Sequence, residues 1–223
     1  MNFTFFITIA ILFYSVSCDR VIINKDNAAI NSILQKMSAD TFVLDIPMVI
    51  GGNDFIPEYS RAKESARDLK LKQLINGTDS IELRVWFNYG NEQQCLRVFN
   101  DKNEWNGELI TVHYTPPKDE QSKWGVSSSV EKKEPKNGWN NYLKKSVKLG
   151  ILTLPDCDKV PGYSFSTGFS KTVAFEIATA NLYRFYSYVS PIYFRKTTKE
   201  ADNVEKLFEL MQLEFGFKMI ETI

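Results

Sequence analysis

The sequence predicts an α+β fold in which amphipathic helices pack on one face of an antiparallel β-meander sheet. Residues 81–114 hold three runs of alternating apolar and polar side chains with short polar turns between them, a pattern typical of neighbouring antiparallel strands. Two more such runs occur at residues 171–179 and 182–189. Segments with helical periodicity precede and follow these runs, without the regular β-α-β order of a parallel doubly wound sheet.

The N-terminal segment has the features of a secretory signal peptide. Residues 3–14 are almost wholly apolar, a run shorter than the about 20 residues that a membrane-spanning helix needs. The small residues Ser15 and Ser17 suit cleavage by a signal peptidase. We therefore expect a signal peptide at residues 1–17, followed by a single α+β domain at residues 18–223. A buried N-terminal strand or helix is the alternative.

Cys18 follows this segment directly. Ser15-Val16-Ser17-Cys18 resembles the lipobox of bacterial lipoproteins, in which the cysteine becomes the first mature residue and carries the lipid. The family prefers an aliphatic residue where this chain has Ser15. The resemblance implies lipidation of Cys18 and attachment to a membrane. The alternative is cleavage near Ser17 or Cys18 and release.

The cysteine count allows one disulfide. With Cys18 lipidated or removed, Cys95 and Cys157 remain as a pair. An oxidising compartment would permit a bridge between them, and the closed loop would add roughly 4 kcal/mol in the chain-entropy model. The sequence does not establish that their Cα atoms come within bonding range, so two buried free thiols are an equal alternative.

Apolar residues at helical spacing predict the helices in order. Residues 27–38 carry such a stripe, and residues 59–75 are rich in strong helix formers up to an Asn-Gly stop. Residues 139–149 form an amphipathic helix that ends at a glycine. At the start of the last helix, Thr197 and Glu200 fit a capping box.

Alternation predicts the strands of the meander at residues 81–89, 94–99 and 104–114. Residues 42–56 are interpreted as an extended strand or a buried loop. The polar connection at residues 115–137 contains one short strand near residues 126–130. A connection of this length is either functional or mobile, and it is also where a boundary between two subdomains is possible.

Candidate catalytic and metal-binding residues are few. His113 is the only histidine, and a lone histidine on a strand is usually a surface residue, although it would be able to act as a general base. One histidine and two distant cysteines do not form the grouped ligands of a zinc site. Residues 101–107 fail the spacing of a calcium loop, and Asp156 and Asp158 are more typical of a turn. We assign no catalytic, cofactor-binding or metal-binding residue.

Charge and aromatic content bear on the partner. Lys and Arg number 27, as do Asp and Glu, so the net charge is zero. A nucleic-acid-binding protein neutralises phosphates with surplus basic residues, and we therefore expect no nucleic-acid partner. Four aromatic residues on the predicted strands would form either a binding face or, more commonly, part of the core: Trp86, Trp105, Tyr186 and Tyr188.

Several stretches in the C-terminal two-thirds of the chain resemble, in combination, uncharacterised exported proteins and lipoproteins of bacteria. They are Ile81-Glu-Leu-Arg-Val-Trp-Phe and the segments at residues 134–139, 150–156, 174–178 and 183–188. The resemblance implies export and an α+β domain. It implies no activity.

We therefore expect an exported, lipid-anchored, non-enzymatic protein of the periplasm or the outer cell-envelope surface that binds a protein or a small ligand. Secretion without an anchor is the alternative location. One alternative function is a cell-envelope hydrolase that uses paired carboxylates among Glu82, Glu176 and Asp156. Another is a stoichiometric inhibitor of an envelope enzyme, acting through a protruding loop at residues 115–137.

Overall fold

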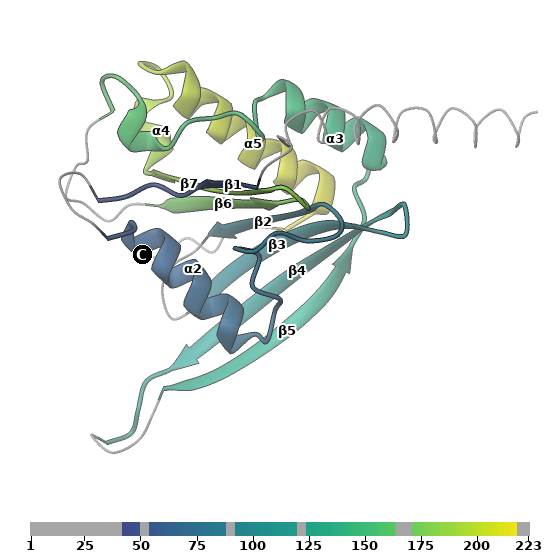
Figure 1. Ribbon diagram of the computed structural model, residues 1–223, viewed down its shortest axis with the longest axis vertical. Coiled ribbons are helices and arrows are strands. Elements are labelled where there is room, and N and C mark those ends of the chain that lie inside the picture. Colours follow the sequence, from purple (N-terminus) through teal and green to yellow (C-terminus); the bar gives the residue numbers. More distant parts are fainter. Residues whose placement is uncertain (1–41, 50–53, 88–91, 120–123, 164–170, 218–223) are drawn as a thin grey trace, which may run out of the picture. The chain divides into compact units, whose positions relative to one another are not determined.

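The computed structural model describes residues 42–49, 54–87, 92–119, 124–163 and 171–217 (Figure 1). Seven strands form one mostly antiparallel sheet in the order β1-β7-β6-β2-β3-β4-β5, which confirms the α+β class. The strands are β1 (Val43–Asp45), β2 (Glu82–Phe87), β3 (Glu92–Asp101), β4 (Glu104–Thr115), β5 (Gly125–Lys133), β6 (Thr172–Ala178) and β7 (Leu182–Val189). The helices are α2 (Pro57–Asp68), α3 (Trp139–Lys148), α4 (Pro191–Phe194), α5 (Lys199–Phe215) and the 3-10 helix η1 (Cys157–Lys159). Within these residues, no helix is long and apolar enough to cross a membrane.

The sheet joins the predicted meander to the predicted hairpin. Strands β2, β3 and β4 pair in succession, β6 pairs with β7, and the antiparallel pairing of β2 with β6 connects the two groups. The short strand β1 runs parallel to β7 at one edge. At the other edge, β5 is a strand of nine residues that pairs with β4. The short strand predicted near residues 126–130 of the polar connection is therefore longer than expected and belongs to the same sheet.

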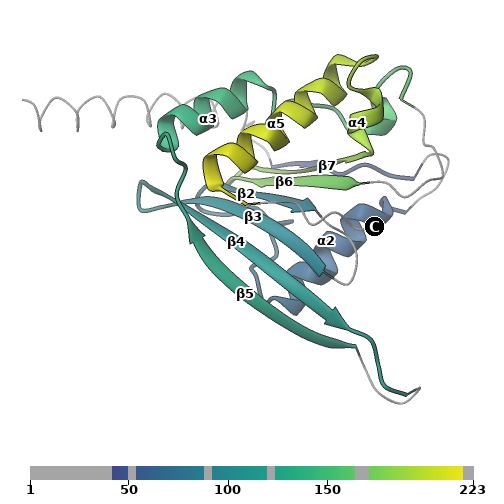
Figure 2. The ribbon, with the colours of Figure 1, turned by 180° about the vertical axis from the view of Figure 1, so that it is seen from behind.

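Helices cover both faces of the sheet, whereas the sequence predicted helices on one face. Neighbouring residues of β2 point to opposite sides. Trp86 lies in a buried cluster with Tyr59 and Ala62 of α2, while the ring of Phe87 packs edge-on against Phe208 of α5, with centroids 5.2 Å apart. Figures 1 and 2 show α2 on one side and α3, α4 and α5 on the other. We call these sides the α2 face and the α5 face.

Helix α2 ends at Asp68, seven residues before the predicted end at Ile75. Lys70 adopts a left-handed conformation with φ of 56°, and the backbone N–H of Leu71 donates to the carbonyl of Ala66 at 2.8 Å. This is the hydrogen bond of a Schellman cap, which ends the helix and satisfies a free carbonyl. The turned chain then buries Leu74 in the core cluster on the α2 face.

The C-terminal helix begins differently from the prediction. Its N-cap is Thr198, and no side chain caps the helix. The hydroxyls of Thr197 and Thr198 both donate to the carbonyl of Phe194, the last residue of α4. The capping box of Thr197 with Glu200 is therefore wrong, because the short helix α4, which the sequence did not predict, uses both hydroxyls. The predicted helix at residues 27–38 and the signal peptide lie outside the described residues.

Candidate functional site

The aromatic residues considered for a binding face belong to the core. Trp86, Trp105, Tyr186 and Tyr188 are all buried. Each packs against other side chains of the sheet or its helices, so they stabilise the fold rather than present a surface. His113 is half exposed, and its Nδ1 lies 3.2 Å from Glu92 Oε2 on the neighbouring strand.

A row of charged side chains crosses the α2 face of the sheet. Strand pairing places four of these residues side by side across β6, β2, β3 and β4, in the order Glu176, Arg84, Arg97 and Glu108. Glu82 lies two residues before Arg84 on β2, and its Oε1 is 2.7 Å from the guanidinium groups of both arginines. Arg97 also donates to Glu108 at 2.9 Å. We call these five residues the ionic row.

The pKa values of the two buried glutamates of the ionic row shift in opposite directions. Burial raises the pKa of Glu176, and the charge of Arg84 at 3.5 Å offsets this only in part. Glu176 also accepts hydrogen bonds from Trp86 Nε1 at 3.2 Å and from the Tyr183 hydroxyl at 3.0 Å. Burial acts on Glu82 as well, but the hydrogen bonds and charges of Arg97 and Arg84 bring its pKa below the ordinary value.

The ionic row is a poor site for hydrolysis. Glu82 and Glu176 are both buried, and Arg84 between them is wholly enclosed and donates to the carbonyl of Lys72, in the segment that follows α2. Their oxygen atoms already accept hydrogen bonds from arginine, tryptophan and tyrosine side chains. A sugar chain would reach them only if the residues that enclose them moved. Cation and hydrogen-bond donors in this arrangement neutralise buried charge, which is a structural task.

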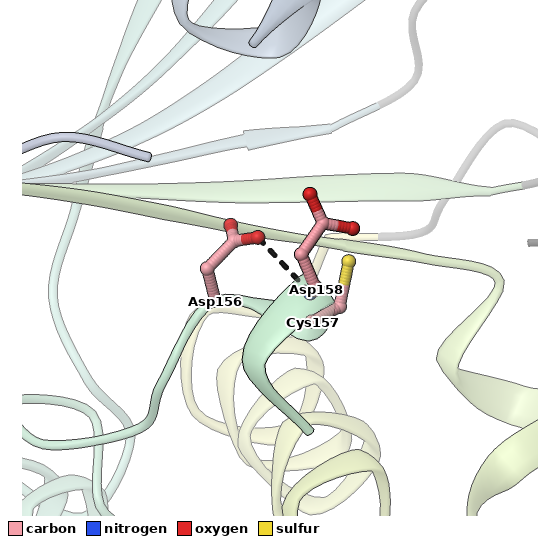
Figure 3. A group of neighbouring side chains, drawn as sticks. All are labelled: Asp156, Cys157 and Asp158. Carbon is pink, nitrogen blue, oxygen red and sulfur yellow. Dashed lines mark hydrogen bonds between the residues drawn. The ribbon is translucent and has the colours of Figure 1, made fainter. Parts of the chain in front are cut away.

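A second acidic group lies at the edge of β7, where Asp156 precedes η1. Asp156 Oδ1 accepts the backbone N–H of Asp158 at 3.1 Å, and Oδ2 accepts the backbone N–H of Ser187 at 2.8 Å. The first bond confirms the predicted turn. The second, with the Ser187 hydroxyl at 3.3 Å, ties η1 to the sheet. Figure 3 shows Asp156, Cys157 and Asp158 extending to the same side of η1.

These three residues form the one group among the described side chains that could hold a metal ion, since one ligand atom from each lies within 4.8 Å of the others. The chemistry fits poorly. Burial raises the pKa of Cys157 far above that of a free thiol, so the ligand form is suppressed. Asp156 already uses both oxygens for backbone N–H groups. The hydrogen bonds of Asp156 to Asp158 and Ser187 instead fix η1 against β7, and we call this arrangement the brace at η1.

The two cysteines of the described chain are free and buried. Cys95 lies on β3 and belongs to the cluster beneath α2, whereas Cys157 lies on η1 beside β7. Strands β2 and β6 separate β3 from β7. Strands are spaced by about 4.8 Å, so three spacings exceed the reach of about 7 Å that a disulfide allows between Cα atoms. The arrangement is that of two structural thiols.

The open edge of the sheet is a feature that sequence reasoning missed. Every residue of β5 except Lys133 is exposed, and β5 pairs with β4 alone among the described strands. Its register with β4 runs without interruption from one end to the other, so it contains no bulge. Figure 1 shows the β4–β5 hairpin extending past the other strands. The sequence predicted only a short strand near residues 126–130, because three serines separate Val126 from Val130, and it gave no sign that this strand lies at the edge of the sheet.

Apolar side chains stand along this edge on the α2 face. Val126 and Val130 pair with Tyr114 and Ile110. Ile110 belongs to the buried cluster on that face, and the Tyr114 hydroxyl lies 3.2 Å from Ser65 Oγ of α2. Val126 is 44% exposed and Val130 59%. Trp124, just before β5, is 55% exposed. The charged residues of β5 are confined to its C-terminal end.

Among the described residues, Glu82, Arg84, Glu176 and Asp156 are buried and each makes hydrogen bonds within the chain, whereas the edge of β5 is accessible to another molecule. No protein-family model, no curated protein and no solved structure matches this chain.

Proposed function

We propose that this protein is a non-enzymatic binding protein of the cell envelope, exported and held at a membrane by a lipid on Cys18. In this proposal it captures an extended segment of a protein partner along the edge of β5. The observation that supports it is the nine-residue strand with an open, regular edge.

Strand addition is the recognition mode that such an edge favours. The N–H and C=O groups on the outer side of β5 have no strand beside them in the described chain. An extended peptide would pair with them and complete the hydrogen bonds, while pockets and side chains along the strand select the sequence. Here Val126 and Val130 would select apolar residues four positions apart in the partner.

The lack of edge protection supports the same proposal. Soluble proteins guard long edge strands with bulges, prolines, central lysines or covering loops, because open edges aggregate. The stretch from Val126 to Val130 contains none of these residues and no bulge. An edge left open over this length is therefore expected to have a partner.

An inhibitor of an envelope enzyme would act through the tip of the same hairpin rather than through its edge. Part of that tip, residues 120–123, lies outside the described residues. The hydrolase alternative receives no support from the buried positions of Glu82 and Glu176.

Photo-cross-linking in the native host would test capture at the edge. A photoreactive amino acid at Val130 is compared with one at Leu213 on α5, which is similarly exposed at 62%. We expect a discrete cross-linked protein product from position 130 and none from position 213. Equal products from both positions would overturn the proposal.

Proline substitution supplies the second arm. Ser127→Pro and Ser128→Pro each remove one backbone N–H, and successive N–H groups on a strand point to opposite sides. One substitution therefore removes a backbone hydrogen bond to β4, and the other removes an N–H donor of the open edge. The variant that changes the open edge is the one that thermal unfolding shows to be less destabilised. That variant should abolish the cross-link at position 130. Its persistence would exclude strand addition.

The anchor is tested by the intact mass of the mature protein from its native host. A mass that begins at Cys18 and includes acyl chains is expected. A mass without acyl chains that begins at or after Cys18 would overturn the anchor and leave a released binding protein.

A further inference from the structure

The side chains of β5 also suggest which strand the edge accepts. This step rests on the proposed strand addition and names its partner. We infer that the added strand is β5 of a second copy of this chain, antiparallel to the first, with a twofold axis through Ser128.

A strand that pairs antiparallel with a second copy of itself has only a limited set of registers. In an antiparallel pair, residues whose N–H and C=O groups point toward the partner must lie opposite one another. A twofold axis therefore passes through a residue, and positions equally distant from that residue are paired. With the axis at Ser128, Val126 lies opposite the second copy's Val130, and Val130 opposite the second copy's Val126.

Neighbouring axes match the side chains less well. With the axis at Ser129, Val130 would lie opposite a serine and Val126 opposite a lysine. With the axis at Ser127, Val130 would lie opposite Trp124, but Val126 would lie opposite a serine. Only the axis at Ser128 places both exposed valines against valines, and directly opposed apolar side chains contribute about 0.2–1 kcal/mol per pair.

The charges agree with this register. Lys132 lies opposite the second copy's Trp124, where its ammonium group can rest on the indole face, an interaction worth about 0.5–1 kcal/mol at an exposed site. Glu131 lies opposite Gly125. No two like charges are opposed among the nine paired positions from Trp124 to Lys132.

The resulting dimer is a single sheet that continues across the axis. All the matched apolar side chains lie on the α2 face, since Val126 and Val130 pair with residues of that face within the chain. The twofold axis stands perpendicular to the sheet, so the α2 faces of both copies lie on the same side. The contact is one strand wide and smaller than a standard interface. We therefore expect a dimer that dissociates on dilution and is favoured where copies are concentrated.

Cysteine cross-linking of the full mature protein tests the register. In Ser128→Cys, the two introduced thiols would lie opposite each other, with Cα atoms about 5 Å apart, which is within disulfide range. We expect mild oxidation to shift this variant to twice the monomer mass, reversibly on reduction. Both native cysteines of the described chain are buried and should not contribute.

Two further variants provide the matched control. In Ser127→Cys, the opposite residue is Ser129, so this single variant should remain monomeric, whereas Ser127→Cys combined with Ser129→Cys should cross-link. Equal cross-linking of Ser127→Cys and Ser128→Cys would overturn the register. Light scattering measures the molar mass of the same samples before oxidation. If it shows only monomer, and neither Ser128→Cys nor the double variant cross-links at that protein concentration, self-association is overturned.

The outcome is separable from that of the proposed function. If Ser128→Cys gives no dimer while position 130 still cross-links to a product that is not twice the monomer mass, the edge binds a different protein and only this inference fails. If neither experiment gives a product, both proposals fail.

Discussion

Replacing Arg84 by methionine would remove the cation that both buried glutamates of the ionic row contact. The Arg84 guanidinium is wholly buried, lies 2.7 Å from Glu82 and 3.5 Å from Glu176, and donates to the Lys72 carbonyl at 2.8 Å. Glu82 keeps two hydrogen bonds from Arg97, at 2.7 and 3.0 Å. The loss therefore falls on Glu176, which becomes a buried carboxylate without a cation.

The loss of stability follows because Glu176 stays buried without its cation. Removing one member of a buried ion pair destabilises a protein by about 3–5 kcal/mol, because the remaining charge stays unpaired in a medium of low polarity. A domain of this kind has a total stability of about 5–15 kcal/mol. We expect Arg84→Met to lower the free energy of unfolding by about 3–5 kcal/mol at neutral pH.

Urea unfolding followed by tryptophan fluorescence measures this change, and a double-mutant cycle assigns it. Glu176→Gln removes the orphaned charge and keeps one acceptor oxygen for the Tyr183 hydroxyl. The double variant Arg84→Met/Glu176→Gln should therefore be more stable than the sum of the single losses predicts, with a coupling of about 1–3 kcal/mol. Additivity within about 0.5 kcal/mol would show that Arg84 and Glu176 do not compensate each other, and the reasoning would be refuted.

Four other outcomes are expected. Because burial raises the pKa of Glu176, its favourable contribution is present below the ordinary carboxyl pKa of about 4.3 and is lost as the pH rises through the raised value; Glu176→Gln should therefore gain stability relative to the parent across that interval in urea unfolding. Glu82, with a lowered pKa, contributes above about pH 4.3 and loses the contribution as the pH falls further, so Glu82→Gln and the parent should converge in acid. Gly77→Ala should cost more in thermal unfolding than the roughly 1–2 kcal/mol expected for Gly216→Ala, since φ is positive at both but only at Gly77 does the new Cβ approach a backbone oxygen, at 2.6 Å; equal losses would contradict this account. Asp156→Ala should cost at least about 2 kcal/mol because it leaves two backbone N–H groups without an acceptor, and a loss under about 0.5 kcal/mol would show that the brace is dispensable.

The strands of the meander were predictable because their alternation is a local property. The structure confirms β2, β3 and β4 close to their expected limits, as it does β6 and β7. The same alternation misled the assignment of faces. Glu82 and Arg84 of β2 alternate with apolar residues, a pattern typical of a strand with one buried and one solvated side. The side that carries these charges is buried on the α2 face, because Glu82, Arg84 and Glu176 satisfy one another there.

The accessible surface could not be deduced in the same way. An open edge is a consequence of the strand order, which depends on pairings between distant segments. The serines at 127–129 give a weak strand signal, and β4 supplies the hydrogen bonds that make them a strand. The signal peptide, the lipid on Cys18 and the envelope location remain predictions from the sequence.

The contrast between the two faces of the sheet has a consequence for how related chains would diverge. On the α5 face, rings such as Phe87, Phe208 and Phe215 hold the core by volume and contact, and one apolar residue can replace another of similar size. On the α2 face, Arg84 and Glu176 depend on each other, so a change in either is tolerated only with a second change. Substitutions in homologues should therefore accumulate singly on the α5 face and in correlated pairs on the α2 face.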